Sequence, residues 1–292
     1  MTPFVRRFRK ALWLAIEHDM LNTAKAAAYS GMLMLFPALV VLTTLLAQAP
    51  EGTTLVGEVR ASFEQFLPAD SMSLLQSALV TRRFHSAQLI FSAAGLSVFA
   101  ALGLMLSLMD GFRRAYRQPR NHWGFWQRRL RALLLVPIVL VPLSLATLVL
   151  VFGRQIEAWM IDNAGHELRH FVLFSWRMVR WAIALLTSIS VLGALYHFGT
   201  RRKEHWAWVG PGALAATLVG FPATLAFGWY VTRIADYSMF YGSFGAGIAT
   251  LVWLYITSFS ALLGAELNGV LYRERQEQTS VSASPDSDCH GL

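Results

Sequence analysis

Six long apolar stretches, separated by charged segments, dominate the pattern of hydrophobic and polar positions along the chain. Each stretch approaches or exceeds the roughly 20 residues that an α-helix needs to cross the hydrocarbon core of a bilayer. Because backbone groups in lipid must be hydrogen-bonded within their own segment, each stretch should be helical. The pattern therefore predicts an all-α integral membrane protein with six transmembrane helices. The stretches are residues 28–49, 89–109, 132–151, 176–198, 208–231 and 244–272.

Short amphipathic segments accompany the six stretches. In residues 3–25, apolar residues recur at helical spacing between basic ones, which is typical of a helix lying in the membrane interface. In the outer loop 50–88, two apolar faces separated by Pro68 predict two further short helices. We thus predict a cytoplasmic amphipathic segment at 1–27, a transmembrane domain at 28–272 and a disordered polar tail at 273–292.

Composition agrees with this pattern. The chain is 55% hydrophobic and 14% charged, well below the roughly 25% charged residues of soluble domains. The single cysteine, Cys289, excludes an intrachain disulfide. The basic N-terminus leads into a full-length apolar stretch without a small-residue cleavage site, so we expect no cleaved signal peptide.

The net charge of +8 is explained by where the basic residues lie. Five precede the first stretch, seven lie between the second and third, three lie between the fourth and fifth, and two follow the sixth. The alternate segments hold the remaining eight. Because basic residues concentrate on the cytoplasmic side, both termini are predicted to be cytoplasmic. We expect membrane lipids with anionic headgroups as partners at this face, at about 1 kcal/mol per basic residue, and no nucleic acid.

Glu266 is the first candidate for a functional residue, because it lies late in the sixth stretch. A carboxylate at membrane depth is expensive to bury and should face the bundle interior, a partner or water. Two interpretations stay open. Glu266 pairs with a basic residue and fixes its helix, or it couples protons or substrate to movement.

Other polar residues of the first and sixth stretches are candidates for a substrate path. Lys25 either reaches anionic lipid or pairs with Glu266 at the same membrane face. Tyr29 shares the helix face of Lys25 by its spacing of four residues. The remaining path candidates are Tyr255, Ser258 and Asn268.

Small residues and prolines predict packing and kinks. Gly242, Gly245 and Ala249 give the start of the sixth stretch a surface for close helix approach, which suits a homo-oligomer or packing within one chain. Pro37 and Pro222 interrupt the first and fifth stretches, where a missing backbone hydrogen bond favours a kink.

No catalytic or metal site is predicted. His166 and His170 have the spacing of a metal-binding pair, but the sequence offers no third or fourth ligand beside them. No phosphate-binding glycine loop occurs, and no nucleophile lies in a pattern that suggests an activating base. We therefore expect neither a cofactor nor an enzyme.

Three segments carry a family resemblance. The run from Lys25 to Pro37 (KAAAYSGMLMLFP), the Gly210-Pro-Gly-Ala213 segment and the run from Tyr241 to Asn268 resemble signatures of the YihY/BrkB family of bacterial inner-membrane proteins. With the six stretches, the resemblance covers about residues 5–272. It implies a location in the bacterial inner membrane and a role in envelope or lipopolysaccharide biology. Members have carried a ribonuclease BN label, which the absence of a carboxylate–histidine cluster in a water-exposed segment does not favour.

These features lead to one main functional hypothesis and one rival. The chain is predicted to move an amphiphilic or lipid-like molecule across or within the bilayer, along a path between the first, fifth and sixth stretches. Without an ATPase motif, active transport would need an ion gradient or a partner. The rival is a non-transporting scaffold for envelope assembly.

Overall fold

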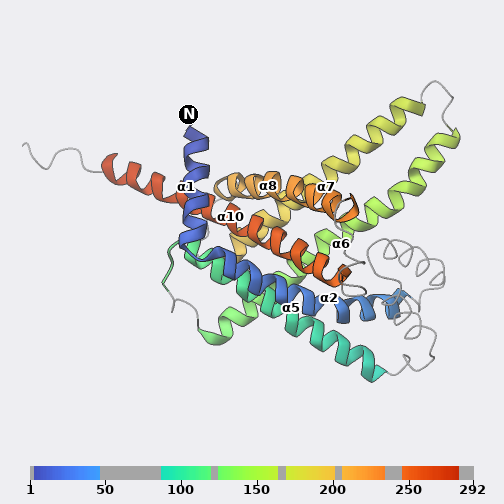
Figure 1. Ribbon diagram of the computed structural model, residues 1–292, viewed down its shortest axis with the longest axis horizontal. Coiled ribbons are helices and arrows are strands. Elements are labelled where there is room, and N and C mark those ends of the chain that lie inside the picture. Colours follow the sequence, from blue (N-terminus) through green and yellow to red (C-terminus); the bar gives the residue numbers. More distant parts are fainter. Residues whose placement is uncertain are drawn as a thin grey trace, which may run out of the picture. The chain divides into compact units, whose positions relative to one another are not determined.

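A computed structural model describes residues 3–46, 87–119, 124–163, 169–200, 206–233 and 245–282. Within these ranges the regular secondary structure is helical and contains no strand (Figure 1). The predicted all-α fold is confirmed. The helices are α1 (Pro3–Glu17), α2 (Met20–Leu46), α5 (Ala87–Ala115), α6 (Phe125–Asn163), α7 (Arg169–Gly199), α8 (Trp206–Arg233) and α10 (Gly245–Ser282).

Six of these helices are long and apolar enough to cross a membrane, which confirms the predicted number of spans. Between 17% and 28% of the most apolar window of each span is buried, and the other described side chains of these windows are half-buried or exposed. Outward-facing apolar side chains are what lipid solvates, because lipid chains are as apolar as leucine. The spans are Met20–Val41, Ile90–Ala115, Phe125–Ala146, Phe174–Gly199, Trp208–Val231 and Gly245–Thr279.

The chain folds into two compact units. Unit 1 contains residues 1–20, 109–219 and 260–292, and unit 2 contains residues 21–108 and 220–259. Helices α2, α5, α8 and α10 each contribute residues to both units.

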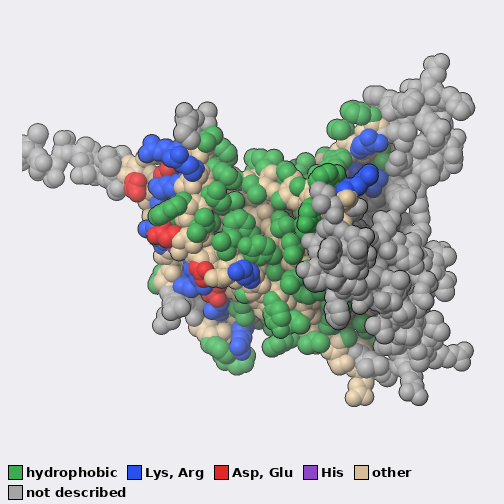
Figure 2. Space-filling model, viewed as in Figure 1, with side chains coloured by type: hydrophobic (Ala, Val, Ile, Leu, Met, Phe, Trp, Pro, Cys, Tyr) green, Lys and Arg blue, Asp and Glu red, His purple; other side chains and the backbone are tan. Residues whose placement is uncertain are grey.

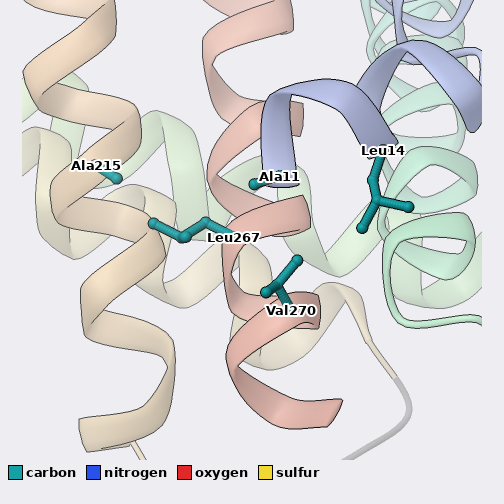
Figure 3. Packing of buried hydrophobic residues seen from close by; sticks show 5 residues of the cluster. All are labelled: Ala11, Leu14, Ala215, Leu267 and Val270. Atoms are coloured by element: carbon teal, nitrogen blue, oxygen red, sulfur yellow. The ribbon is translucent and has the colours of Figure 1, made fainter. Parts of the chain in front are cut away.

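The core of unit 1 is built around α10. Residues 260–270 are buried without interruption, so this part of the helix is covered on all sides. Leu267 and Val270 pack with Ala11 and Leu14 of α1 and with Ala215 of α8 (Figure 3). α10 is therefore the central helix of unit 1, and α1 packs directly onto it.

Two glycine contacts bring other helices close to α10. A Cβ atom on Gly264 would overlap the carbonyl oxygen of Gly212 and the hydroxyl of Tyr196. A Cβ atom on Gly269 would overlap the carbonyl oxygen of Ala115, at the end of α5. Only glycine permits such close backbone approach, as in small-residue contacts between membrane helices.

Unit 2 also packs through small residues. Gly31 of α2 lies against Leu254 of α10, and Gly247 of α10 lies against Met32. Of the residues predicted for packing, Gly245 is buried and Ala249 is half-buried, while Gly242 lies outside the described residues. Their role in a homo-oligomer stays a prediction.

Two predicted boundaries are corrected by the structure. α10 continues to Ser282, so the expectation of a disordered tail from residue 273 is wrong for residues 273–282. Contacts explain this extension: Glu274 pairs with Arg7, and the Arg275 guanidinium lies 3.3 Å from the ring centroid of Trp208. The amphipathic segment 3–25 is likewise two helices, because α1 ends at Glu17 and α2 begins at Met20.

Prolines do not end the helices that contain them. α2 continues through Pro37, and α8 extends from Trp206 to Arg233 across Pro222. α6 continues through Pro137 and Pro142. Pro37 and Pro222 therefore lie inside unbroken helices, and the kinks at these positions stay a prediction. The two short helices predicted in the outer loop 50–88 lie outside the described residues.

Candidate functional site

The candidate site lies at the corner between α1 and α2. Asp19 adopts a left-handed backbone conformation (φ 59°), which aspartate tolerates better than most residues, and the chain turns there. Arg114 of α5 donates a 3.2 Å hydrogen bond to the carbonyl oxygen of His18 and lies 3.7 Å from the carboxylate of Asp19. These contacts hold the corner against the end of α5 and orient His18.

Glu266 of α10 contacts this corner. Its Oε1 atom lies 2.5 Å from Nδ1 of His18, and its side chain is 0% exposed, against 17% for His18. The second carboxylate oxygen, Oε2, is buried and has no hydrogen-bond partner among the described residues. A buried carboxylate with one occupied and one free oxygen is unusual, because buried polar atoms are nearly always hydrogen-bonded.

Two arginines add positive charge near Glu266. The charges of Arg273 and Arg117 both act on its carboxylate, together with that of His18. Arg273 lies on the same face of α10 as Glu266 by its spacing of seven residues, and its Nη1 donates a 3.0 Å bond to the Ala115 carbonyl. The site is therefore a buried acid surrounded by three basic groups. Such a group can hold a proton between carboxylate and imidazole.

Asn268 joins α10 to α8. Its Oδ1 accepts a 2.8 Å hydrogen bond from the Gly212 amide, and its Nδ2 donates a 3.0 Å bond to the Val209 carbonyl. The side chain is 1% exposed. The two backbone partners of the Asn268 side chain thus lie on either side of Pro211. The predicted part of Asn268 in a substrate path stays a prediction.

Tyr196 of α7 completes the buried polar group around α10. Its hydroxyl donates a 2.6 Å hydrogen bond to the Ala261 carbonyl, and its ring stands edge-on to Phe112 of α5. Tyrosine at such a position combines a large buried ring with a satisfied hydroxyl. This residue therefore fixes α7 against the centre of unit 1.

The other predicted path residues belong to unit 2. Lys25 is exposed and donates a 3.2 Å hydrogen bond to Asn22 Oδ1. Tyr29 is 63% exposed. Tyr255 stacks with Phe259, and Ser258 is half-buried on the same helix. The part of these residues in a substrate path stays a prediction. Lys25 was also considered as a partner of Glu266, but the side chain that the structure shows in contact with Glu266 is His18.

Charged side chains gather over one part of unit 1. Figure 2 shows basic and acidic residues over α1 and the C-terminal end of α10. Arg7 and Glu274 form a partly exposed ion pair there, with 2.7 Å between Nε and Oε2.

The described residues contain no group of three or more potential metal ligands, and His166 lies outside them.

His18 was missed by sequence reasoning. One local signal existed, since His18 ends a basic amphipathic segment directly before the first span. Its partner, however, is 248 positions away along the chain. Local periodicity cannot indicate such a contact.

Comparison with known proteins supplies the family. Residues 14–288 match the family described as Virulence factor BrkB. The chain belongs to this family. One relative, the ribonuclease-like protein YfkH of Bacillus subtilis, is 29% identical over 89% of this chain and 92% of its own length. The UPF0761 membrane protein VP0125 of Vibrio parahaemolyticus is 28% identical over 93% of this chain and 84% of its own.

A third relative is similar over less of its own length. The UPF0761 membrane protein of Chromohalobacter salexigens is 26% identical over 95% of this chain and 66% of its own. No solved structure matches the chain. The family match, the six candidate spans and the UPF0761 membrane-protein relatives together establish a BrkB-family membrane protein, as the resemblance implied.

Proposed function

We propose that this protein moves a lipid-like or other envelope amphiphile across or within the membrane, and that Glu266 and His18 carry the proton that accompanies the movement. The observation that carries the proposal is the buried Glu266–His18 contact with its free carboxylate oxygen. Ionisable residues inside membrane spans commonly mark substrate or proton pathways. The exposed apolar faces of the spans suit a substrate that enters from lipid.

The chemistry of the pair supports a proton-carrying role. A proton lies between Nδ1 and Oε1 whether the pair is imidazolium–carboxylate, neutral imidazole–carboxylate or neutral imidazole–carboxylic acid. The hydrogen bond can thus persist while the charge of the pair changes. Because a charge buried without compensation is costly, such a change would favour a different packing of α1 against α10.

We further propose that the protein lies in the bacterial inner membrane with both termini in the cytoplasm. The unequal distribution of basic residues between alternate segments supports this orientation. The α1 helix would then lie at the cytoplasmic interface, with Arg6, Arg9 and Lys10 exposed toward anionic headgroups.

Cysteine labelling tests the orientation. Cys289 is the single cysteine of the chain, so a membrane-impermeant maleimide reports the side of the C-terminal tail. We expect labelling of permeabilised cells and none of intact spheroplasts. A Cys289→Ala variant gives the background, and equal labelling of spheroplasts and permeabilised cells would place the tail outside.

Lipid movement in liposomes tests the activity. Purified protein is reconstituted with fluorescent phospholipid and lipopolysaccharide-precursor analogues, and an external quencher reports the rate at which inner-leaflet probe reaches the outside. We expect movement of at least one analogue well above protein-free liposomes. Folded protein that moves none of them would contradict transport and favour the scaffold.

A further inference from the structure

A group of donors without acceptors lies at the end of α5. Arg117 is exposed, adopts a left-handed backbone conformation (φ 49°), and forms no hydrogen bond or ion pair through its guanidinium with the described residues. The buried Nη2 of Arg273 and the buried Nε2 of Gln118 also lack acceptors in that part of the chain. Unpaired buried donors are uncommon, which points to a missing acceptor.

The backbone carbonyl oxygens at the end of α5 are not the missing acceptor. Helices usually leave their last four carbonyl oxygens unpaired, but here each has a donor. The amides of Tyr116, Gln118 and Arg117 donate to the carbonyls of Phe112, Arg113 and Arg114, in that order. The Nη1 atom of Arg273 donates to the carbonyl of Ala115. The guanidinium of Arg117 and the Nη2 of Arg273 therefore remain available to an external group.

The local charge favours an anion. The charges of Arg117 and Arg273 act on each other and on Glu266, and the charge of Glu277 also acts on Arg273. The Oε1 atom of Glu266 contacts His18 and its Oε2 atom has no hydrogen bond to the described residues, so neither oxygen is bonded to a guanidinium. Two guanidinium groups that repel each other suit phosphate, whose oxygens match the planar fork of a guanidinium.

The position of the group suits a lipid headgroup. Arg117 follows closely on Ala115, the last residue of the candidate span Ile90–Ala115. A residue just beyond a span lies at the depth of the headgroups. We propose that Arg117, Arg273 and Gln118 form a binding site for a phosphate group, carried by a lipid or free in solution. As a substrate site this rests on the proposed transport function, whereas binding itself does not.

Native mass spectrometry of the full-length protein in detergent tests the site. We expect phosphatidic acid to be retained and diacylglycerol, which lacks the phosphate, to be lost. Arg117→Gln should weaken retention about tenfold, as expected for a charge-assisted hydrogen bond, and Arg117→Lys should weaken it less. The control is Arg129→Gln, because the Arg129 guanidinium lies over the Phe125 ring at 4.0 Å.

Competition with inorganic phosphate separates the two sources. Displacement of phosphatidic acid by millimolar phosphate would assign the site to the phosphate group alone, and retention would assign it to the lipid headgroup. Equal binding by the wild type and Arg117→Gln, an equal loss in Arg129→Gln, or retention of diacylglycerol would overturn the proposal. Arg117→Gln is preferred to Arg273→Gln because Arg273 also caps Ala115.

Glu266→Gln distinguishes this proposal from transport. Removing the negative charge beside the arginines should strengthen phosphatidic acid binding several-fold, although proton-linked movement should fall. Binding that follows these expectations in a protein without lipid movement would leave the phosphate site standing and refute transport. Lipid movement by a wild-type protein that does not bind phosphatidic acid would leave transport standing and refute the phosphate site.

Discussion

Gly264→Ala is expected to destabilise the protein by about 3 kcal/mol or more, which is the upper range for overpacked cores. The new methyl group would overlap the Gly212 carbonyl, the Tyr196 hydroxyl and Ala216. Gly212 contributes backbone, which cannot rotate away, so relief requires α8 and α10 to separate. That separation would also strain the two hydrogen bonds between Asn268 and the backbone of α8.

Thermal unfolding in detergent measures this effect. The matched control is Gly95→Ala in α5, where a Cβ would meet no atom within 4 Å. That change should be neutral or slightly stabilising, since alanine favours helices by about 1 kcal/mol over glycine. Equal stability of the two variants would show that α8 and α10 do not approach as closely as described.

His18 and Glu266 are expected to be strongly coupled in a double-mutant cycle. Alanine at either position removes the contact, and alanine at His18 alone also leaves a buried carboxylate without this partner. Hydrogen bonds to charged groups contribute about 1.5–3 kcal/mol, so the coupling free energy should fall in this range. Unfolding free energies of the wild type, the single variants and the double variant give the value.

The ion pair between α1 and α10 is the internal control. Arg7 and Glu274 form it, with side chains 38% and 28% exposed. Partly exposed pairs contribute about 1 kcal/mol at most, so the same cycle on Arg7 and Glu274 should give a smaller coupling free energy. If the His18–Glu266 cycle gave no more than this control, the buried contact would not hold the corner between α1 and α2 against α10.

The six spans could be predicted because each depends on a local property, the length of an apolar run. Their ends were harder. α2 begins at Met20 rather than near Ala28 because its first turns bury Thr23, Ala24 and Ala27 while Asn22 and Lys25 remain exposed. A search for apolar runs leaves out helical turns that contain both apolar and polar residues, although tertiary packing makes these turns helical.

The candidate site was predicted only in part. Glu266 was identifiable because a carboxylate inside an apolar span is rare. Its partner His18 was not, and neither was Tyr196, which lies in an apolar context and pairs with a backbone carbonyl 65 positions away. The helical extension of α10 to Ser282 was also missed, because the contacts of Glu274 and Arg275 outweigh the polar composition of that segment.

The rate of lipid movement in Glu266→Gln liposomes, compared with Glu274→Gln, tests the central claim most directly. Both changes replace one carboxylate by its amide on the same helix, but only Glu266 is fully buried against His18. We expect at least about a tenfold loss of rate for Glu266→Gln, a lower bound that lies below the roughly 10²–10⁴-fold contributed by a positioned acid or base. Glu274→Gln should retain the wild-type rate. Movement at the wild-type rate in folded Glu266→Gln protein would contradict the account, because the buried pair would then carry no proton needed for transport.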